Sequence, residues 1–159
     1  MDTGLPHKNQ SASAAAGDPA AALDIRLGCH LLLRDMGVSA LNEVTLKTAR
    51  RVDMMALHKS GEIWVIEIKS SINDFRSDQK WPGYLDYADQ FFFAVAPDFP
   101  TGILPENTGL IVADRYGAAI MRDAPKHKLP TARRKQLIQT MALVGARRLS
   151  ALEIAAQQS

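Results

Sequence analysis

The run EIWVIEIK, residues 62–69, constrains the fold of this chain more than any other segment. Its β-branched and aromatic residues favour a strand, and its apolar content is typical of a central strand buried on both faces. Glu67 and Lys69 are two residues apart, so on a strand both side chains leave the same face. Because buried charges are costly unless they are paired or bound to a metal, these two residues mark a candidate functional site.

The segment before this strand predicts its partner. Lys59-Ser60-Gly61 is a three-residue loop with glycine where a hairpin needs a left-handed residue, so residues 51–58 form the preceding strand. The register from this loop sets Asp53 opposite Glu67, and directly opposed residues of an antiparallel pair project on the same face. Asp53 therefore joins Glu67 and Lys69, although a two-residue loop would shift the register by one.

Two carboxylates and a backbone carbonyl form an oxygen site suited to Mg²⁺ or Mn²⁺. Such a metal lowers the pKa of bound water and neutralises charge that develops on a phosphodiester. Lys69 is suited to position or deprotonate the attacking water, or to hold the phosphate as a point charge. Glu43 is a third candidate ligand if its face agrees. The alternative is an ion pair of Lys69 with Glu67 or Asp53 at a sheet end, without metal.

The remaining segments predict one α/β domain. A helix follows Gly17-Asp18-Pro19 and ends near Met36, and further elements are expected at 38–47 (strand), 74–89 (helical, interrupted at Pro82-Gly83), 91–96 (strand), 110–121 (hairpin) and 131–149 (helix). The order α-β-β-β-α-β, then a hairpin and a helix, implies a mixed sheet flanked by helices. A chain of 159 residues has the usual size of one domain. Residues 1–20 are expected to be a disordered tail, which leaves 21–159 as the domain.

Cysteine content and hydropathy exclude several protein classes. The single cysteine, Cys29, excludes a disulfide within the chain and a cysteine-rich zinc site, and it fits a reducing compartment. No stretch approaches the roughly 20 apolar residues that span a bilayer, and residues 1–10 lack the pattern of a signal peptide. We therefore expect a cytoplasmic protein that has no membrane partner.

Basic residues gather near the carboxyl end. The net charge of +2 is too small to indicate a partner, but residues 126–148 hold seven Lys and Arg and no acidic residue. Such a segment either attracts a polyanion such as DNA or is a solvated helix face. Arg133, Arg134 and Lys135 are its candidate DNA contacts.

A second candidate group follows the strand that carries Lys69. Arg76 and Lys80 are four residues apart, hence on one helix face, and they either contact phosphates beside the metal site or pair with Asp74 and Asp78. Three aromatic residues recur here at a spacing of three, Trp81, Tyr84 and Tyr87. This stripe predicts packing against the core rather than a platform for stacking bases of a single strand.

The pattern of Asp53 and Glu67-Ile68-Lys69 resembles the PD-(D/E)XK nuclease superfamily. The common core of that superfamily is α-β-β-β-α-β, with an acidic residue on the second strand and (D/E)-x-K on the third, and these residues fall on those positions. Val52 stands where the superfamily name has proline, a residue that members of the superfamily often lack.

More narrowly, residues 50–95 are similar to the MmcB-like DNA repair proteins of bacteria. The stretches that carry this likeness include Arg51-Val52-Asp53, residues 64–71, Asp74-Phe75-Arg76, Lys80-Trp81-Pro82 and Phe93-Ala94-Val95. The resemblance implies a restriction-endonuclease-like fold and a DNA repair protein acting as a Mg²⁺- or Mn²⁺-dependent deoxyribonuclease.

In that resemblance Asp53, Glu67 and the Ile68 carbonyl hold the metal, and Lys69 is the catalytic lysine. Some members of the superfamily have lost cleavage. The alternative function is therefore a catalytically inactive module that binds DNA or recruits other repair proteins.

Overall fold

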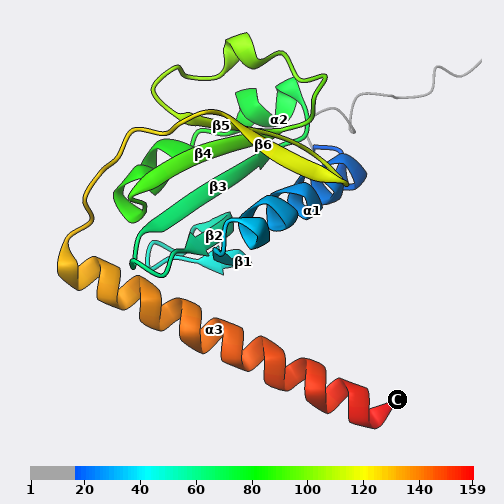
Figure 1. The fold of residues 1–159 in the computed structure, drawn as a ribbon, viewed down its shortest axis with the longest axis vertical. Coiled ribbons are helices and arrows are strands. Elements are labelled where there is room, and N and C mark those ends of the chain that lie inside the picture. Colours follow the sequence, from blue (N-terminus) through cyan, green and yellow to red (C-terminus); the bar gives the residue numbers. More distant parts are fainter. Residues whose placement is uncertain (1–16) are drawn as a thin grey trace, which may run out of the picture.

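A six-stranded mixed sheet forms the centre of the computed structural model, which describes residues 17–159 (Figure 1). The strands are β1 (Ser39–Thr45), β2 (Arg51–Leu57), β3 (Ile63–Lys69), β4 (Gln90–Val95), β5 (Gly109–Asp114) and β6 (Gly117–Arg122). Their spatial order follows the chain, from β1 at one edge to β6 at the other. The pairs β3–β4 and β4–β5 are parallel, and the other pairs are antiparallel. Every residue of β3 and β4 is buried, as predicted for β3.

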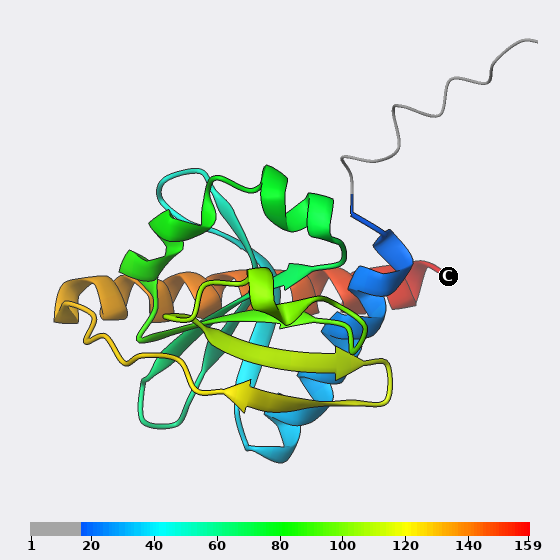
Figure 2. The ribbon, with the colours of Figure 1, turned by 90° about the horizontal axis from the view of Figure 1, so that it is seen from above.

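Helices cover both faces of the sheet. They are α1 (Pro19–Asp35), α2 (Ile72–Ser77) and α3 (Thr131–Gln158), with two short 3₁₀ helices, η1 (Trp81–Tyr87) and η2 (Thr101–Ile103). The order α1-β1-β2-β3-α2-β4 is the predicted core, so the α/β class is confirmed and the architecture is consistent with a restriction-endonuclease-like fold. Seen from above, α3 runs across the molecule behind the sheet (Figure 2).

Two apolar clusters form the core, one on each face, because successive residues of a strand point to opposite sides. Ile66 of β3 packs in the cluster that contains Ile25 and Leu33 of α1. Val65, its neighbour, packs in the cluster that contains Leu137 and Met141 of α3. The central strand is thus covered by apolar side chains on both faces, and only its carboxyl end carries charge.

Helix α1 begins at Pro19, directly after its N-cap residue Asp18. The Asp18 side chain accepts a hydrogen bond of 3.0 Å from the N–H of Ala20, and Pro19 occupies the first turn. Gly37, at φ +71°, follows the helix end. Residues 19 and 20 therefore belong to α1 and not to the predicted tail. Residues 1–16 of that tail lie outside the described part of the chain.

Two other boundaries differ from the predictions. The expected helical region 74–89 is divided into α2 and η1 by residues 78–80, and Pro82 lies in the first turn of η1. Helix α3 continues to Gln158, beyond the predicted end near residue 149. Residues 149–158 are mostly good helix formers and include no glycine or proline, so the helix continues without a buried stripe. Within residues 17–159, no helix has the length and apolar character needed to cross a membrane.

Candidate functional site

The hairpin between β2 and β3 has the predicted register. Met54 pairs with Ile66 and Leu57 with Ile63, and the same offset brings Asp53 opposite Glu67. Gly61 adopts φ +88°, the left-handed conformation that this loop requires. The short loop therefore fixes which side chains meet at the far end of the hairpin.

Beyond the last β2–β3 pair, carboxylates make the hydrogen bonds between the two strands. The N–H of Asp53 donates to Oε1 of Glu67 at 2.9 Å, and the N–H of Ile68 donates to Oδ2 of Asp53 at 2.8 Å. Each side chain is thereby held by the backbone of the opposite strand. Because a carboxylate has two oxygens, each keeps a second oxygen with which to bind a further ligand.

Burial and mutual repulsion act on both carboxylates. The Glu67 side chain is almost fully buried. Its burial, together with the neighbouring Asp53 charge, raises the pKa of Glu67 to about 9. Burial likewise raises the pKa of Asp53, despite the hydrogen bond from Ile68 and the positive charge of Lys69. Two adjacent carboxylates that are costly to ionise form a site that a divalent cation would stabilise.

Lys69 forms a buried ion pair with Asp78. Its Nζ lies 2.7 Å from Oδ2 of Asp78, and both side chains are shielded from solvent. Burial alone would lower the pKa of Lys69, but the hydrogen bond and charge of Asp78 outweigh it and raise that pKa. The sequence offered Glu67 or Asp53 as the ion-pair partner of Lys69, and this alternative is wrong because the partner is Asp78. Asp78, from the segment after α2, was missed because nothing in the sequence fixes how that segment folds back.

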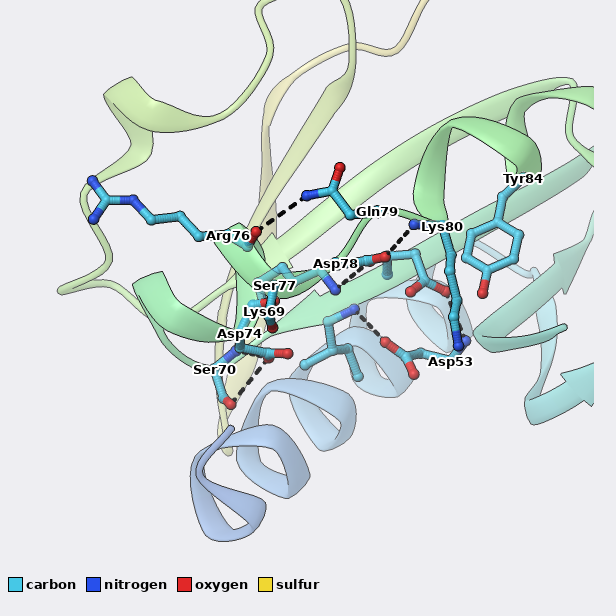
Figure 3. A network of polar contacts seen from close by, with 12 residues as sticks. Asp53, Lys69, Ser70, Asp74, Arg76, Ser77, Asp78, Gln79, Lys80 and Tyr84 are labelled. Carbon is cyan, nitrogen blue, oxygen red and sulfur yellow. Dashed lines mark hydrogen bonds and ion pairs between the residues drawn. The ribbon is translucent and has the colours of Figure 1, made fainter. Parts of the chain in front are cut away.

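Asp53, Glu67 and Lys69 line a pocket of about 420 Å³ at the end of the sheet, and Figure 3 shows the polar contacts around Asp53 and Lys69. Besides Asp53, Glu67 and Lys69, its wall includes Glu43 and residues of α1 and of the β3–α2 turn. Glu43 lies on β1 with φ +52° and is 3.6 Å from Arg51. Across residues 17–159, no three His, Cys, Asp or Glu side chains converge closely enough to hold a metal. Glu43 thus shares the pocket, but its carboxylate does not join those of Asp53 and Glu67.

Tyr84 lies beside the site. The sequence predicted only that this residue packs in the core. It is buried, as the aromatic stripe predicted, and its hydroxyl donates to the carbonyl of Arg51 at 3.2 Å. Burial and the nearby charges of Glu67, Asp78 and Asp53 raise the pKa of Tyr84 to about 12. Its hydroxyl therefore keeps its proton beside the carboxylates.

Arg76 and Lys80 are both exposed. The Arg76 side chain extends away from Asp53 (Figure 3). The backbone N–H of Lys80 donates to Oδ1 of Asp78 at 2.7 Å. Among the described residues, neither cation forms the alternative ion pair with Asp74 or Asp78, since Asp74 accepts from Ser70 and Asp78 binds Lys69.

The three candidate DNA contacts at the start of α3 lie near the opposite end of β3. Arg134 pairs with both carboxylate oxygens of Asp89, at 2.5 and 2.7 Å, and also donates to the carbonyl of Gly61, just before β3 begins. Arg133 lies over the ring of Tyr87, 4.8 Å from its centroid, and Lys135 is exposed. The length of β3 separates this region from the carboxylate pocket by roughly 20 Å. The structure therefore does not bring these candidates together with Asp53 and Glu67.

Comparison with known proteins identifies relatives of the whole domain. Residues 9–156 match the family described as DNA repair protein MmcB-like. Among solved structures, the chain is similar to the SPO1766 protein of unknown function from Silicibacter pomeroyi, with 46% sequence identity and a TM-score of 0.82. That likeness covers 86% of this chain and 93% of the other. No curated protein matches the chain.

Proposed function

Because the chain belongs to the MmcB-like family of DNA repair proteins, we propose that it is a metal-dependent nuclease that hydrolyses phosphodiester bonds of DNA. The observation that carries this proposal is the pair of carboxylates, half-buried Asp53 and buried Glu67, that are joined by hydrogen bonds between their strands and line one pocket. The same residues, on adjacent strands of an αβββαβ core, support membership of the PD-(D/E)XK superfamily.

The donor set of the pocket fits Mg²⁺ or Mn²⁺. Asp53, Glu67 and the carbonyl of Ile68 supply hard oxygen ligands, and burial raises the pKa of both carboxyls even though Lys69 lies nearby. When bound, the metal supplies an activated water and neutralises charge on the phosphodiester. The hydrogen bonds from Asp53 and Ile68 hold the two carboxylates in place before any ligand arrives.

Lys69 serves this reaction as a fixed positive charge. Its raised pKa keeps the ammonium protonated near neutral pH, so Lys69 does not act as the base that deprotonates water. An ammonium held by Asp78 at 2.7 Å retains two further N–H donors. These donors orient the attacking water or the phosphate at the pocket floor.

Cleavage assays with labelled DNA test the proposal. Single-stranded, duplex and branched substrates would be incubated with Mg²⁺ or Mn²⁺ and with wild-type protein, Asp53→Asn or Glu67→Gln. We expect wild-type cleavage to fall at least about 100-fold in both variants, together with loss of Mn²⁺ binding by calorimetry. Asp35→Asn, a change at an exposed carboxylate on α1, is the control and should cleave normally.

Absence of both cleavage and metal binding in the wild-type protein, with and without DNA, would overturn the nuclease proposal. If DNA binding persists under those conditions, the alternative of an inactive DNA-binding or partner-recruiting module replaces it.

A further inference from the structure

Helix α1 forms the wall of the pocket beside the carboxylates. Pro19, Ala22, Leu23 and Arg26 line it, and their spacing of i, i+3, i+4 and i+7 places them on one face of the helix. The first three present an apolar surface, and Leu23 remains 45% exposed. Arg26 adds a guanidinium at the end of this surface, so the wall changes from apolar to cationic along the helix.

Arg26 has no partner of its own among residues 17–159. Arg26 and Lys69 are the two cations among the residues that line the pocket, and Lys69 is already paired with Asp78. By contrast, Arg26 takes part in none of the ion pairs of the described chain. It is only partly buried, so its charge remains available to a ligand in the pocket.

We infer that Arg26 binds a phosphate of the DNA strand and positions the strand against Asp53 and Glu67. This inference rests on the proposed function and assigns the substrate contact on the helix wall. A guanidinium matches two phosphate oxygens at once, which a single ammonium does not. The apolar surface of Ala22 and Leu23 lies beside it and receives the adjoining sugar. The phosphate is then held between a cation on α1 and the carboxylate floor.

Binding of fluorescein-labelled single-stranded and duplex oligonucleotides, followed by anisotropy over a series of salt concentrations, tests this inference. The full chain would be used with Ca²⁺ in place of Mg²⁺. We expect Arg26→Gln to weaken binding about 10-fold and to lower the salt slope by about one. Arg26→Lys keeps the charge and should keep the slope, with part of the affinity lost.

Arg34→Gln is the matched control. Arg34 lies on the same helix, its side chain is 73% exposed and pairs with the neighbouring Asp35, and it does not line the pocket, so this change should leave both affinity and slope unaltered. Melting temperatures of the three variants should equal that of the wild type, which separates loss of a phosphate contact from loss of folding.

Unchanged affinity and slope in Arg26→Gln would overturn the inference, and so would absence of DNA binding by the wild-type protein. The proposed nuclease fails by a different result. If Mn²⁺ does not bind and no DNA is cleaved, but the effect of Arg26→Gln persists, the phosphate contact stands and the nuclease does not. If Glu67→Gln abolishes cleavage while Arg26→Gln behaves as wild type, only the contact is wrong.

Discussion

Glu67 occupies a position where an ionised carboxylate opposes folding. The residue is 4% exposed and lies opposite Asp53. Within residues 17–159 it forms no ion pair, since Lys69 is bound to Asp78. The neighbouring residues of β3 are buried and apolar, so an apolar residue of similar size would suit this position better for folding alone. A buried acid kept at this cost is typical of residues that serve a ligand rather than the fold.

This cost predicts how stability depends on pH. The pKa of Glu67 is about 9 in the folded chain and 4.5 in its ordinary state. A carboxyl whose folded pKa is raised contributes stability that is complete below pH 4.5 and is lost as the pH rises toward 9. At about 1.4 kcal/mol per pKa unit, this shift corresponds to about 6 kcal/mol, so we expect the metal-free wild type to lose several kcal/mol relative to Glu67→Gln over that range, measured by urea unfolding in EDTA.

Glu106→Gln, at an exposed acid, should give a pH profile parallel to that of the wild type. Added Mn²⁺ should remove the loss in the wild type but not alter Glu67→Gln, because only the former keeps both carboxylates. Parallel profiles for the wild type and Glu67→Gln would show that Glu67 ionises normally.

The ion pair of Lys69 with Asp78 predicts a large effect of breaking it. Asp78→Asn leaves a buried ammonium without a counter-charge, because the Lys69 side chain is 5% exposed. We expect a loss of about 3 kcal/mol in the free energy of unfolding. Glu43→Gln breaks a solvent-exposed pair with Arg51 and should cost less than about 1 kcal/mol. Equal losses in the two variants, from denaturant unfolding, would contradict this interpretation.

At the scale of elements, α3 is attached to the sheet by its arginines. Arg134 binds Asp89 and Gly61, near the start of β3, and Arg148 donates to the carbonyls of Asn42 and Glu43 on β1. The basic segment, for which the sequence left open a DNA surface or a solvated helix face, therefore uses part of its charge in contacts within the protein. Helix α3 thus carries arginines that bind other parts of the protein as well as exposed cations, such as Lys135, that remain free to bind a ligand.

Adjacent substitutions distinguish these roles. Arg134→Gln leaves Asp89 buried without its cation, so we expect a loss of about 3 kcal/mol in stability with little change in DNA affinity at temperatures where the variant is folded. Lys135→Gln, at the exposed neighbour, should leave stability within about 0.5 kcal/mol of the wild type. Thermal unfolding and anisotropy measure the two quantities. A drop in DNA affinity for folded Arg134→Gln, without a loss of stability, would contradict this assignment.

The same contrast shows which features the sequence predicts. The register that joins Asp53 to Glu67 follows from a three-residue loop, because local turn geometry fixes strand pairing. The partners of Lys69 and Arg134 do not follow, since Asp78 and Asp89 reach them through segments whose path depends on the whole fold. The pocket face of Arg26 on α1 was also missed, because helical spacing gives a face but not what that face meets.

At the scale of the whole molecule, the carboxylate pocket lies where the hairpin strands diverge and α1 and the β3–α2 turn close around them. The carboxyl end of α3 extends past the sheet (Figure 1). Leu137 and Met141 of α3 are buried in the core, whereas Leu149, Leu152 and Ile154 are largely exposed. Residues of α3 after Arg148 therefore contribute little to the packed core of the domain.

This division predicts the effect of shortening the chain. A protein ending at Arg148 keeps the buried residues of α3 and the contacts of Arg148 with β1, so its free energy of unfolding should stay within about 1 kcal/mol of the full chain. A protein ending at Lys135 loses Leu137 and Met141, two core side chains worth about 2–5 kcal/mol each, and should be largely unfolded. Urea unfolding followed by circular dichroism measures both. If ending the chain at Arg148 destabilised it as much as ending it at Lys135, the exposed leucines of α3 would have a packing role that this fold does not give them.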